Sequence, residues 1–112
     1  MYQIVKCLFP FADDFDKGKP RPSLIISDSF GRYNHTILAY ITTNLEDRLD
    51  TDIFIDAAKP YFTKTGLRFS SVIKLHRLIT ITPSQIGEVI GSLPDELILK
   101  LKKNLMKVFQ LK

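Results

Sequence analysis

Short runs of β-branched and apolar residues, each closed by turn-forming residues, fill most of the first 82 positions and constrain the fold most strongly. β-Branched and aromatic residues favour strands, and this composition predicts strands over residues 3–9, 22–27, 35–43, 52–56 and 68–82, the last with a bend near His76. In 35–43 ("HTILAYITT") both alternating sets are largely apolar, which is typical of a strand covered on both faces. The pattern therefore predicts a mainly β domain.

The C-terminal residues 92–112 follow a helical period instead. Acidic residues (Asp95, Glu96) stand at the start of this segment and lysines toward its end, as the helix dipole favours. Its apolar stripe, expected to pack in the core or at an interface, comprises Leu97, Leu101, Leu105, Val108 and Phe109. About five strands followed by a terminal helix indicate a small, partly open β-barrel.

A second, shorter helix is predicted just before this one. Thr82-Pro83-Ser84 has the features of a helix start, because proline suits the first helical position. Gly87 and Gly91 limit how far such a helix would extend.

Size and charge narrow the function classes. With 112 residues, we expect one domain spanning 1–112. A net charge of +4 is compatible with a polyanionic partner such as nucleic acid. The single cysteine, Cys7, forms no internal disulfide or zinc site and is expected to be a small buried hydrophobe. No apolar run has membrane-spanning length and no signal peptide is recognised, which predicts a cytoplasmic protein without a membrane partner.

Arg21 lies between Pro20 and Pro22, directly before the strand over 22–27. The prolines stiffen the backbone under Arg21. A guanidinium on a stiff backbone suits bidentate recognition of phosphate. The alternative is a solvated salt bridge with an aspartate of the preceding loop, namely Asp13, Asp14 or Asp16.

Hydroxyl and imidazole groups provide the other candidates. Thr42 and Thr43 end the strand over 35–43, where a hydroxyl can bind a phosphate oxygen or cap a turn. His35 and His76 can transfer protons near neutral pH, or can be ordinary polar residues. No metal-ligand cluster, glycine-rich phosphate loop or nucleophile elbow is present, so neither a metal nor a cofactor is expected.

Several segments in a fixed order resemble the MazF/PemK family, the toxins of type II toxin–antitoxin modules. They are "IVKCLFPF", "KPRPSLIIS", "AYITTN", "GLRFSSVIKLHRLITI" and "IGSLPDELILKLKKNL". The resemblance implies an SH3-like β-barrel with a C-terminal helix, usually a homodimer. It implies a metal-independent endoribonuclease that cleaves single-stranded RNA by 2′-hydroxyl attack, leaving a 2′,3′-cyclic phosphate and a 5′-hydroxyl. It also implies a cognate antitoxin as partner, with operator DNA contacted only through that antitoxin.

The resemblance also assigns roles to residues. Arg21 in "RPSLII" and Thr42 in "YIT" match the catalytic arginine and threonine of the family, and His76 stands where a general base is expected. Residues expected to bind substrate are Lys19, Thr43, Asn44, Ser71 and Lys74.

Two other functions remain open on the sequence alone. The chain resembles the family but departs from it at Tyr2-Gln3 and in the late strand, which leaves a catalytically inactive relative that binds RNA, antitoxin or an operator complex. The other is a small barrel unrelated to the family, whose positive charge only aids solubility.

Overall fold

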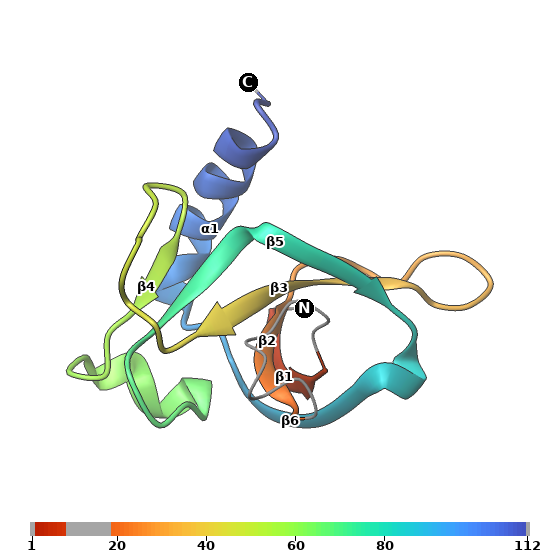
Figure 1. Ribbon diagram of the computed structural model, residues 1–112, viewed down its shortest axis with the longest axis horizontal. Helices are drawn as coiled ribbons and strands as arrows, with labels where there is room; N and C mark the ends of the chain where they lie inside the picture. Colours follow the sequence, from red (N-terminus) through yellow and green to blue (C-terminus); the bar gives the residue numbers. More distant parts are fainter. Residues whose placement is uncertain (1, 9–18, 112) are drawn as a thin grey trace.

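The computed structural model describes residues 2–8 and 19–111, which form a mainly β structure (Figure 1). Its strands build one antiparallel sheet in the order β4-β5-β3-β2-β1-β6. They are β1 (Gln3–Cys7), β2 (Arg21–Ile25), β3 (Thr36–Thr42), β4 (Ile53–Ile55), β5 (Ser71–Ile81) and β6 (Ile86–Ser92). The described helices are the 3-10 helices η2 (Pro60–Thr65) and η3 (Pro83–Gln85) and the helix α1 (Asp95–Val108).

The predicted architecture, a mainly β and partly open barrel with a C-terminal helix, is confirmed. β4 and β6 are the edge strands, so strand pairing does not close the sheet. The end of η2, which follows β4, packs against β6 instead. A Cβ on Gly91 would collide with the backbone of Thr65, and a Cβ on Gly66 with the backbone of Ile90. Glycine at both positions therefore lets the two ends of the sheet approach each other.

Each of the five predicted strands overlaps an observed one, and the expected irregularity near His76 is present. β3 and β5 pair continuously except at one place, where Ala39 faces Leu78 but the next residue, Tyr40, faces Lys74. Three residues of β5, including His76, therefore lie between these two pairs as a bulge. Bulges bend a strand and redirect its side chains, and this one places His76 on the surface.

The prediction of a short helix after Thr82 is wrong beyond its first turn. Pro83 begins only η3, where the Thr82 N–H donates to Gln85 Oε1 at 2.9 Å. The chain then extends as β6 and pairs with β1. A Cβ on Gly87 would lie 2.9 Å from the Lys6 carbonyl oxygen. The glycines that suggested a short helix are therefore needed for close strand packing.

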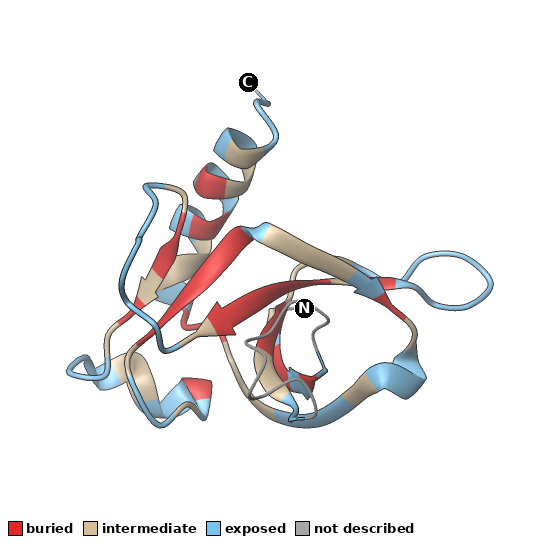
Figure 2. Cartoon of the chain, viewed as in Figure 1, coloured by how far each residue is buried: buried red, intermediate tan, exposed pale blue. Residues whose placement is uncertain are grey.

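Both faces of the sheet are covered, as the pattern in 35–43 predicted. Ala39 and Ile41 of β3 belong to the buried cluster beneath α1, whereas Leu38 and Tyr40 belong to a second cluster on the opposite face. Figure 2 shows β3 and the first half of β5 as the most continuously buried parts of the sheet. Cys7 lies in the second cluster, where burial raises the pKa of its thiol.

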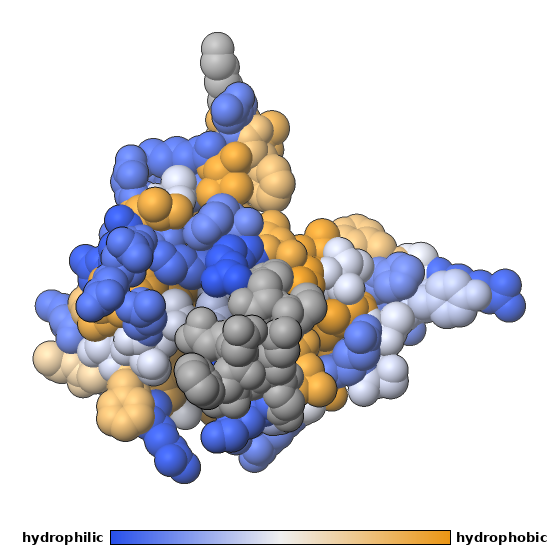
Figure 3. Space-filling view, in the orientation of Figure 1, coloured by the Kyte–Doolittle hydropathy of each residue, from blue (hydrophilic) through white to orange (hydrophobic). Residues whose placement is uncertain are grey.

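The predicted stripe of α1 packs largely as expected. Leu101 is fully buried, and Leu97, Leu105 and Val108 are partly buried against the same core. Phe109 follows the last turn and is exposed, and Figure 3 shows apolar surface near this outer end of the helix. Within the described residues, no helix combines the length and apolar character needed to cross a membrane.

Candidate active site

Arg21 is the first residue of β2 and lies at the end of the two central strands. Its backbone pairs with Cys7 of β1 on one side. On the other side, β2 and β3 pair in a register that places Ser23 opposite Tyr40. Arg21 precedes Ser23 by two residues in β2, and Thr42 follows Tyr40 by two residues in β3. The two residues that the sequence resemblance marks as catalytic therefore lie at adjoining ends of neighbouring strands.

These strand ends open into a pocket of about 560 Å³, here called the arginine pocket. Four of the predicted residues line it: Arg21, Thr42, Thr43 and Ser71. Ser71 donates its hydroxyl to the Phe69 carbonyl at 2.8 Å, which fixes the side chain at the pocket wall.

Among the described residues that line it, the arginine pocket has more positive than negative side chains. Lys6 of β1 and Arg68 line it together with Arg21, whereas Glu88 of β6 is the carboxylate among its lining residues. The Lys6 ammonium lies 4.0 Å from the Glu88 carboxylate, and both side chains are well exposed to solvent. Exposed pairs of this kind interact weakly, so the pocket remains suited to an anionic group.

From the sequence, the Thr42 hydroxyl was expected either to bind a phosphate oxygen or to cap a turn, and its surroundings allow both. Its Oγ1 accepts a hydrogen bond from the Asn44 N–H at 3.1 Å, and Asn44 Oδ1 in turn accepts from the Glu46 N–H at 3.0 Å. Thr42 therefore caps the turn that follows β3. A hydroxyl that accepts one bond still has its own proton to donate, so capping leaves Thr42 able to bind a phosphate oxygen.

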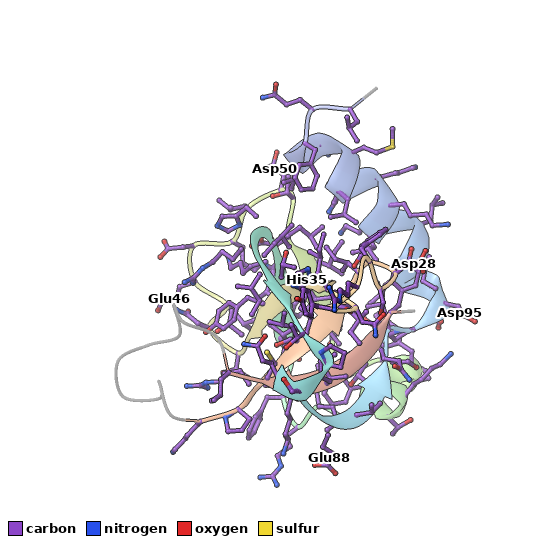
Figure 4. The ribbon with its side chains drawn as sticks, turned by 90° about the vertical axis from the view of Figure 1, so that its right-hand side faces the viewer. Asp28, His35, Glu46, Asp50, Glu88 and Asp95 are labelled. Atoms are coloured by element: carbon purple, nitrogen blue, oxygen red, sulfur yellow. The ribbon has the colours of Figure 1, made fainter. Side chains whose placement is uncertain are left out.

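A second pocket, of about 290 Å³, lies on the other side of Thr42 and is here called the loop pocket. The β3–β4 connection (residues 43–52) supplies much of its lining, and Thr42 lines both pockets. Figure 4 labels Glu46 and Asp50 of this connection, and Glu46 lies on the side of the molecule opposite Asp95 at the start of α1. Of the predicted residues, the loop pocket brings together Thr42, Asn44, Lys74 and His76.

Lys74 occupies a different environment from that of a surface cation. Its ammonium lies 2.7 Å from Asp52 Oδ2 and donates to the Asp47 carbonyl at 3.2 Å. The pair is buried, with side-chain exposures of 11% for Lys74 and 3% for Asp52. Lys74 therefore borders the loop pocket while its charge is neutralised beneath the pocket wall.

The remaining candidates lie in three places. His76, in the β5 bulge, lines the loop pocket. His35, labelled in Figure 4, lies in the β2–β3 hairpin and lines neither pocket. Lys19 is exposed before β2 and lines neither pocket as the described residues form them. Asp13, Asp14 and Asp16, the alternative partners of Arg21, lie outside the described residues. In residues 2–8 and 19–111, no three His, Cys, Asp or Glu side chains lie close enough together to hold a metal ion.

Sequence reasoning missed Lys6, Arg68 and Asp52. Lys6 is the one charged residue in the otherwise apolar run of β1, and a lysine interrupting such a run was a signal that this position faces solvent. Arg68 follows the Gly66 turn and had no comparable signal. The ion pair of Asp52 with Lys74 joins residues far apart in sequence, so no local sequence pattern indicated it.

Comparisons with known proteins identify a family and a shared fold. A family model described as "PemK-like, MazF-like toxin of type II toxin-antitoxin system" matches residues 1–109. A search of curated proteins found no match. Among solved structures, the Mycobacterium tuberculosis toxin MazF-mt6 superposes with a TM-score of 0.74 at 24% identity, covering 98% of each chain.

Two further structures superpose at lower identity. One is an endoribonuclease in complex with its cognate antitoxin from a mycobacterial species, with a TM-score of 0.73, 14% identity and coverage of 99% of this chain and 94% of that one. The other is MazE–MazF from Deinococcus radiodurans, with a TM-score of 0.68, 14% identity and the same coverage. At these identities the superpositions establish the fold.

Proposed function

The chain belongs to the PemK-like, MazF-like toxin family of type II toxin–antitoxin systems, whose members are known as endoribonucleases, and we propose that it cleaves single-stranded RNA without a metal ion. One observation carries this proposal. Arg21 and Thr42 lie on neighbouring strand ends and line one pocket whose charge is predominantly positive. Such a pocket suits the phosphodiester backbone, whose charge dominates the affinity of proteins for nucleic acid.

The proposed reaction transfers the phosphoryl group within the RNA. The 2′-oxygen attacks the adjacent phosphorus, and the bond from phosphorus to the 5′-oxygen breaks. The products are a 2′,3′-cyclic phosphate and a 5′-hydroxyl. Negative charge accumulates on the phosphate oxygens and on the leaving oxygen. A preorganised guanidinium from Arg21 and a donated hydroxyl from Thr42 would stabilise that charge.

Proton transfer completes the reaction. We assign His76 as the base that takes the 2′-hydroxyl proton, because it lines the loop pocket beside Thr42. A water molecule gives a proton to the leaving 5′-oxygen, and the resulting hydroxide takes the proton back from His76, which restores the base. Thr43, Asn44 and Ser71, which line one pocket or the other, would contact the nucleotides that flank the cut.

The proposal extends to partners. A mycobacterial endoribonuclease of similar fold was solved with its cognate antitoxin, and the Deinococcus structure pairs MazE with MazF. We therefore propose that an antitoxin occupies the arginine pocket and blocks RNA, that the chain acts as a homodimer, and that operator DNA is contacted only through the antitoxin.

The test is incubation of the purified chain with a long single-stranded RNA in EDTA, followed by sequencing of the product ends. Cuts that carry cyclic phosphate and 5′-hydroxyl ends support the proposal. Intact RNA in the presence of a folded chain overturns it. Tight RNA or antitoxin binding in that case would identify a binding module instead.

A further inference from the structure

The buried Lys74–Asp52 pair holds the β3–β4 connection at several points. Asp52 Oδ2 accepts from the Lys74 ammonium at 2.7 Å and from the Leu49 N–H at 2.8 Å. The same ammonium donates to the Asp47 carbonyl at 3.2 Å. Asp47 has a φ of 54°, a backbone conformation uncommon for residues other than glycine. The pair thus fixes the middle of the connection in a specific shape.

The end of the connection that leads into β4 is anchored to α1. Asn104 of α1 is buried, and its Nδ2 donates to the carbonyls of Thr51 and Asp52 at 3.2 and 3.3 Å. The end that follows β3 is held by the hydrogen bond that the Asn44 N–H donates to Thr42 Oγ1. A connection that contains little regular structure is therefore tied to the sheet, to the helix and to a buried charge.

An exposed Lys–Asp pair elsewhere in the protein provides a comparison for the buried Lys74–Asp52 pair. Lys64 and Asp95 lie 3.7 Å apart with side-chain exposures of 51% and 83%, and neither residue lines either pocket. Burying two charges has a desolvation cost that the pair only partly recovers. A buried pair is therefore better explained by the shape that it imposes than by net stability, and here that shape is the wall of the loop pocket.

We propose that the Lys74–Asp52 pair is a positioning device that holds the β3–β4 connection as a preformed wall, and that the loop pocket behind this wall selects the nucleobase beside the scissile phosphate. This inference rests on the proposed ribonuclease function. Thr42 lines both pockets, so a phosphate bound at Thr42 in the arginine pocket has its neighbouring nucleotide at the loop pocket. A cavity of about 290 Å³ is large enough to admit one base.

The polar groups of the wall indicate which bases it accepts. The lining of the loop pocket includes the carboxylates of Glu46 and Asp47, which only accept hydrogen bonds, and the guanidinium of Arg77, which only donates them. Every base offers an acceptor to a guanidinium, so the carboxylates are the groups that can distinguish one base from another. Adenine, cytosine and guanine each offer an exocyclic amino group as donor. Uracil offers carbonyl oxygens on both sides of its single N–H, and these repel a carboxylate. The loop pocket therefore favours a base with an amino group over uracil.

The test uses short RNAs that contain the mapped cleavage motif and differ in one nucleotide on either side of the cut. For the unmodified chain we expect kcat/KM to be lower by about fivefold or more when uracil replaces the preferred base at one of these positions. The double variant Asp52→Leu/Lys74→Met removes both charges together, which proteins often tolerate. We expect it to fold and to lose this discrimination mainly through a higher KM for the preferred RNA.

The matched control is Lys64→Met/Asp95→Leu, which makes the same chemical changes in the exposed pair and should keep the discrimination. Glu46→Gln, on the exposed part of the wall, decides the matter if the buried double variant does not fold, and it should also reduce the preference over uracil. Equal cleavage of uracil RNAs by the unmodified chain, or unchanged discrimination in a folded double variant or in Glu46→Gln, overturns the inference. RNA that the unmodified chain leaves intact instead overturns the proposed function on which the inference rests.

Discussion

The arginine pocket and the loop pocket share Thr42 but are built in different ways. The ends of adjacent strands supply Arg21 and Thr42 to the arginine pocket, so ladder hydrogen bonds of the sheet fix their backbones. The loop pocket depends on the irregular β3–β4 connection, whose shape is fixed by a buried ion pair. One pocket thus derives its rigidity from regular secondary structure, and the other from side-chain contacts centred on a buried ion pair.

This difference predicts that substitutions in the two pockets affect different properties of the protein. Removing a side chain from the arginine pocket should affect the reaction and leave the fold intact. Removing one partner of the ion pair should affect the fold and, through it, the loop pocket. Four substitutions test this division, taken in order of decreasing expected free-energy change.

Lys74→Met should have the largest effect, on stability. It leaves the Asp52 carboxylate buried without its partner, which costs about 3–5 kcal/mol in the free energy of unfolding. Urea denaturation of the variant gives this value, with Lys64→Met in the exposed pair as control, expected to change it by about 1 kcal/mol or less. Equal effects of the two variants would remove the distinction between the pairs.

Arg21→Ala should mainly reduce catalysis. Loss of one preorganised donor to the developing charge lowers kcat/KM by about 10²–10³-fold. The unfolding free energy should change little. Arg32→Ala, in the exposed β2–β3 hairpin, makes the same chemical change outside both pockets and should leave cleavage unaltered. Undiminished cleavage by purified Arg21→Ala would show that the arginine is not catalytic.

Thr42→Val should have an intermediate effect, because this residue serves both pockets. It removes the donor to a phosphate oxygen and the cap for the Asn44 N–H. A hydrogen bond to a charged group is worth about 1.5–3 kcal/mol, or roughly a 10- to 150-fold loss in cleavage rate. Thr42→Ser keeps the hydroxyl and should retain most activity. If both variants are equally slow, the hydroxyl is not the functional group.

Arg68→Gln should have the smallest effect. Arg68 lines the arginine pocket without belonging to the sheet, so it contributes charge more than position. We expect weaker RNA binding at low salt and a logarithmic salt dependence of affinity that is shallower by about one. Fluorescence anisotropy with labelled RNA across a salt series measures this. An unchanged slope would indicate that Arg68 does not contact phosphate.

Most of the strands and the terminal helix were predictable from the sequence. Alternation and β-branched composition located five of the strands, and the motif around Arg21 placed it directly before a strand, one residue from its observed position as the first residue of β2. The terminal helix followed from its apolar stripe and its charge bias. In each case the physical cause acts between residues that are close in sequence or share a regular period.

Features that depend on contacts between distant segments were not predictable. Gly87 and Gly91 suggested a short helix, because nothing local shows that the backbones of Lys6 and Thr65 approach them. Lys74 was predicted to bind substrate, yet its ammonium pairs with Asp52, a partner that only the folded sheet brings near. The assignments of Arg21, Thr42 and His76 stay predictions until cleavage is measured.

The position of β1 in the sheet has a consequence for folding during synthesis. β1 pairs with β2, its neighbour along the chain, but also with β6, which is synthesised only after β2, β3, β4 and β5. The arginine pocket takes Lys6 from the first of these strands and Glu88 and Ile90 from the last. Contacts between such distant segments form late and slowly. A nascent chain on the ribosome therefore carries an incomplete arginine pocket until Ile90 has emerged.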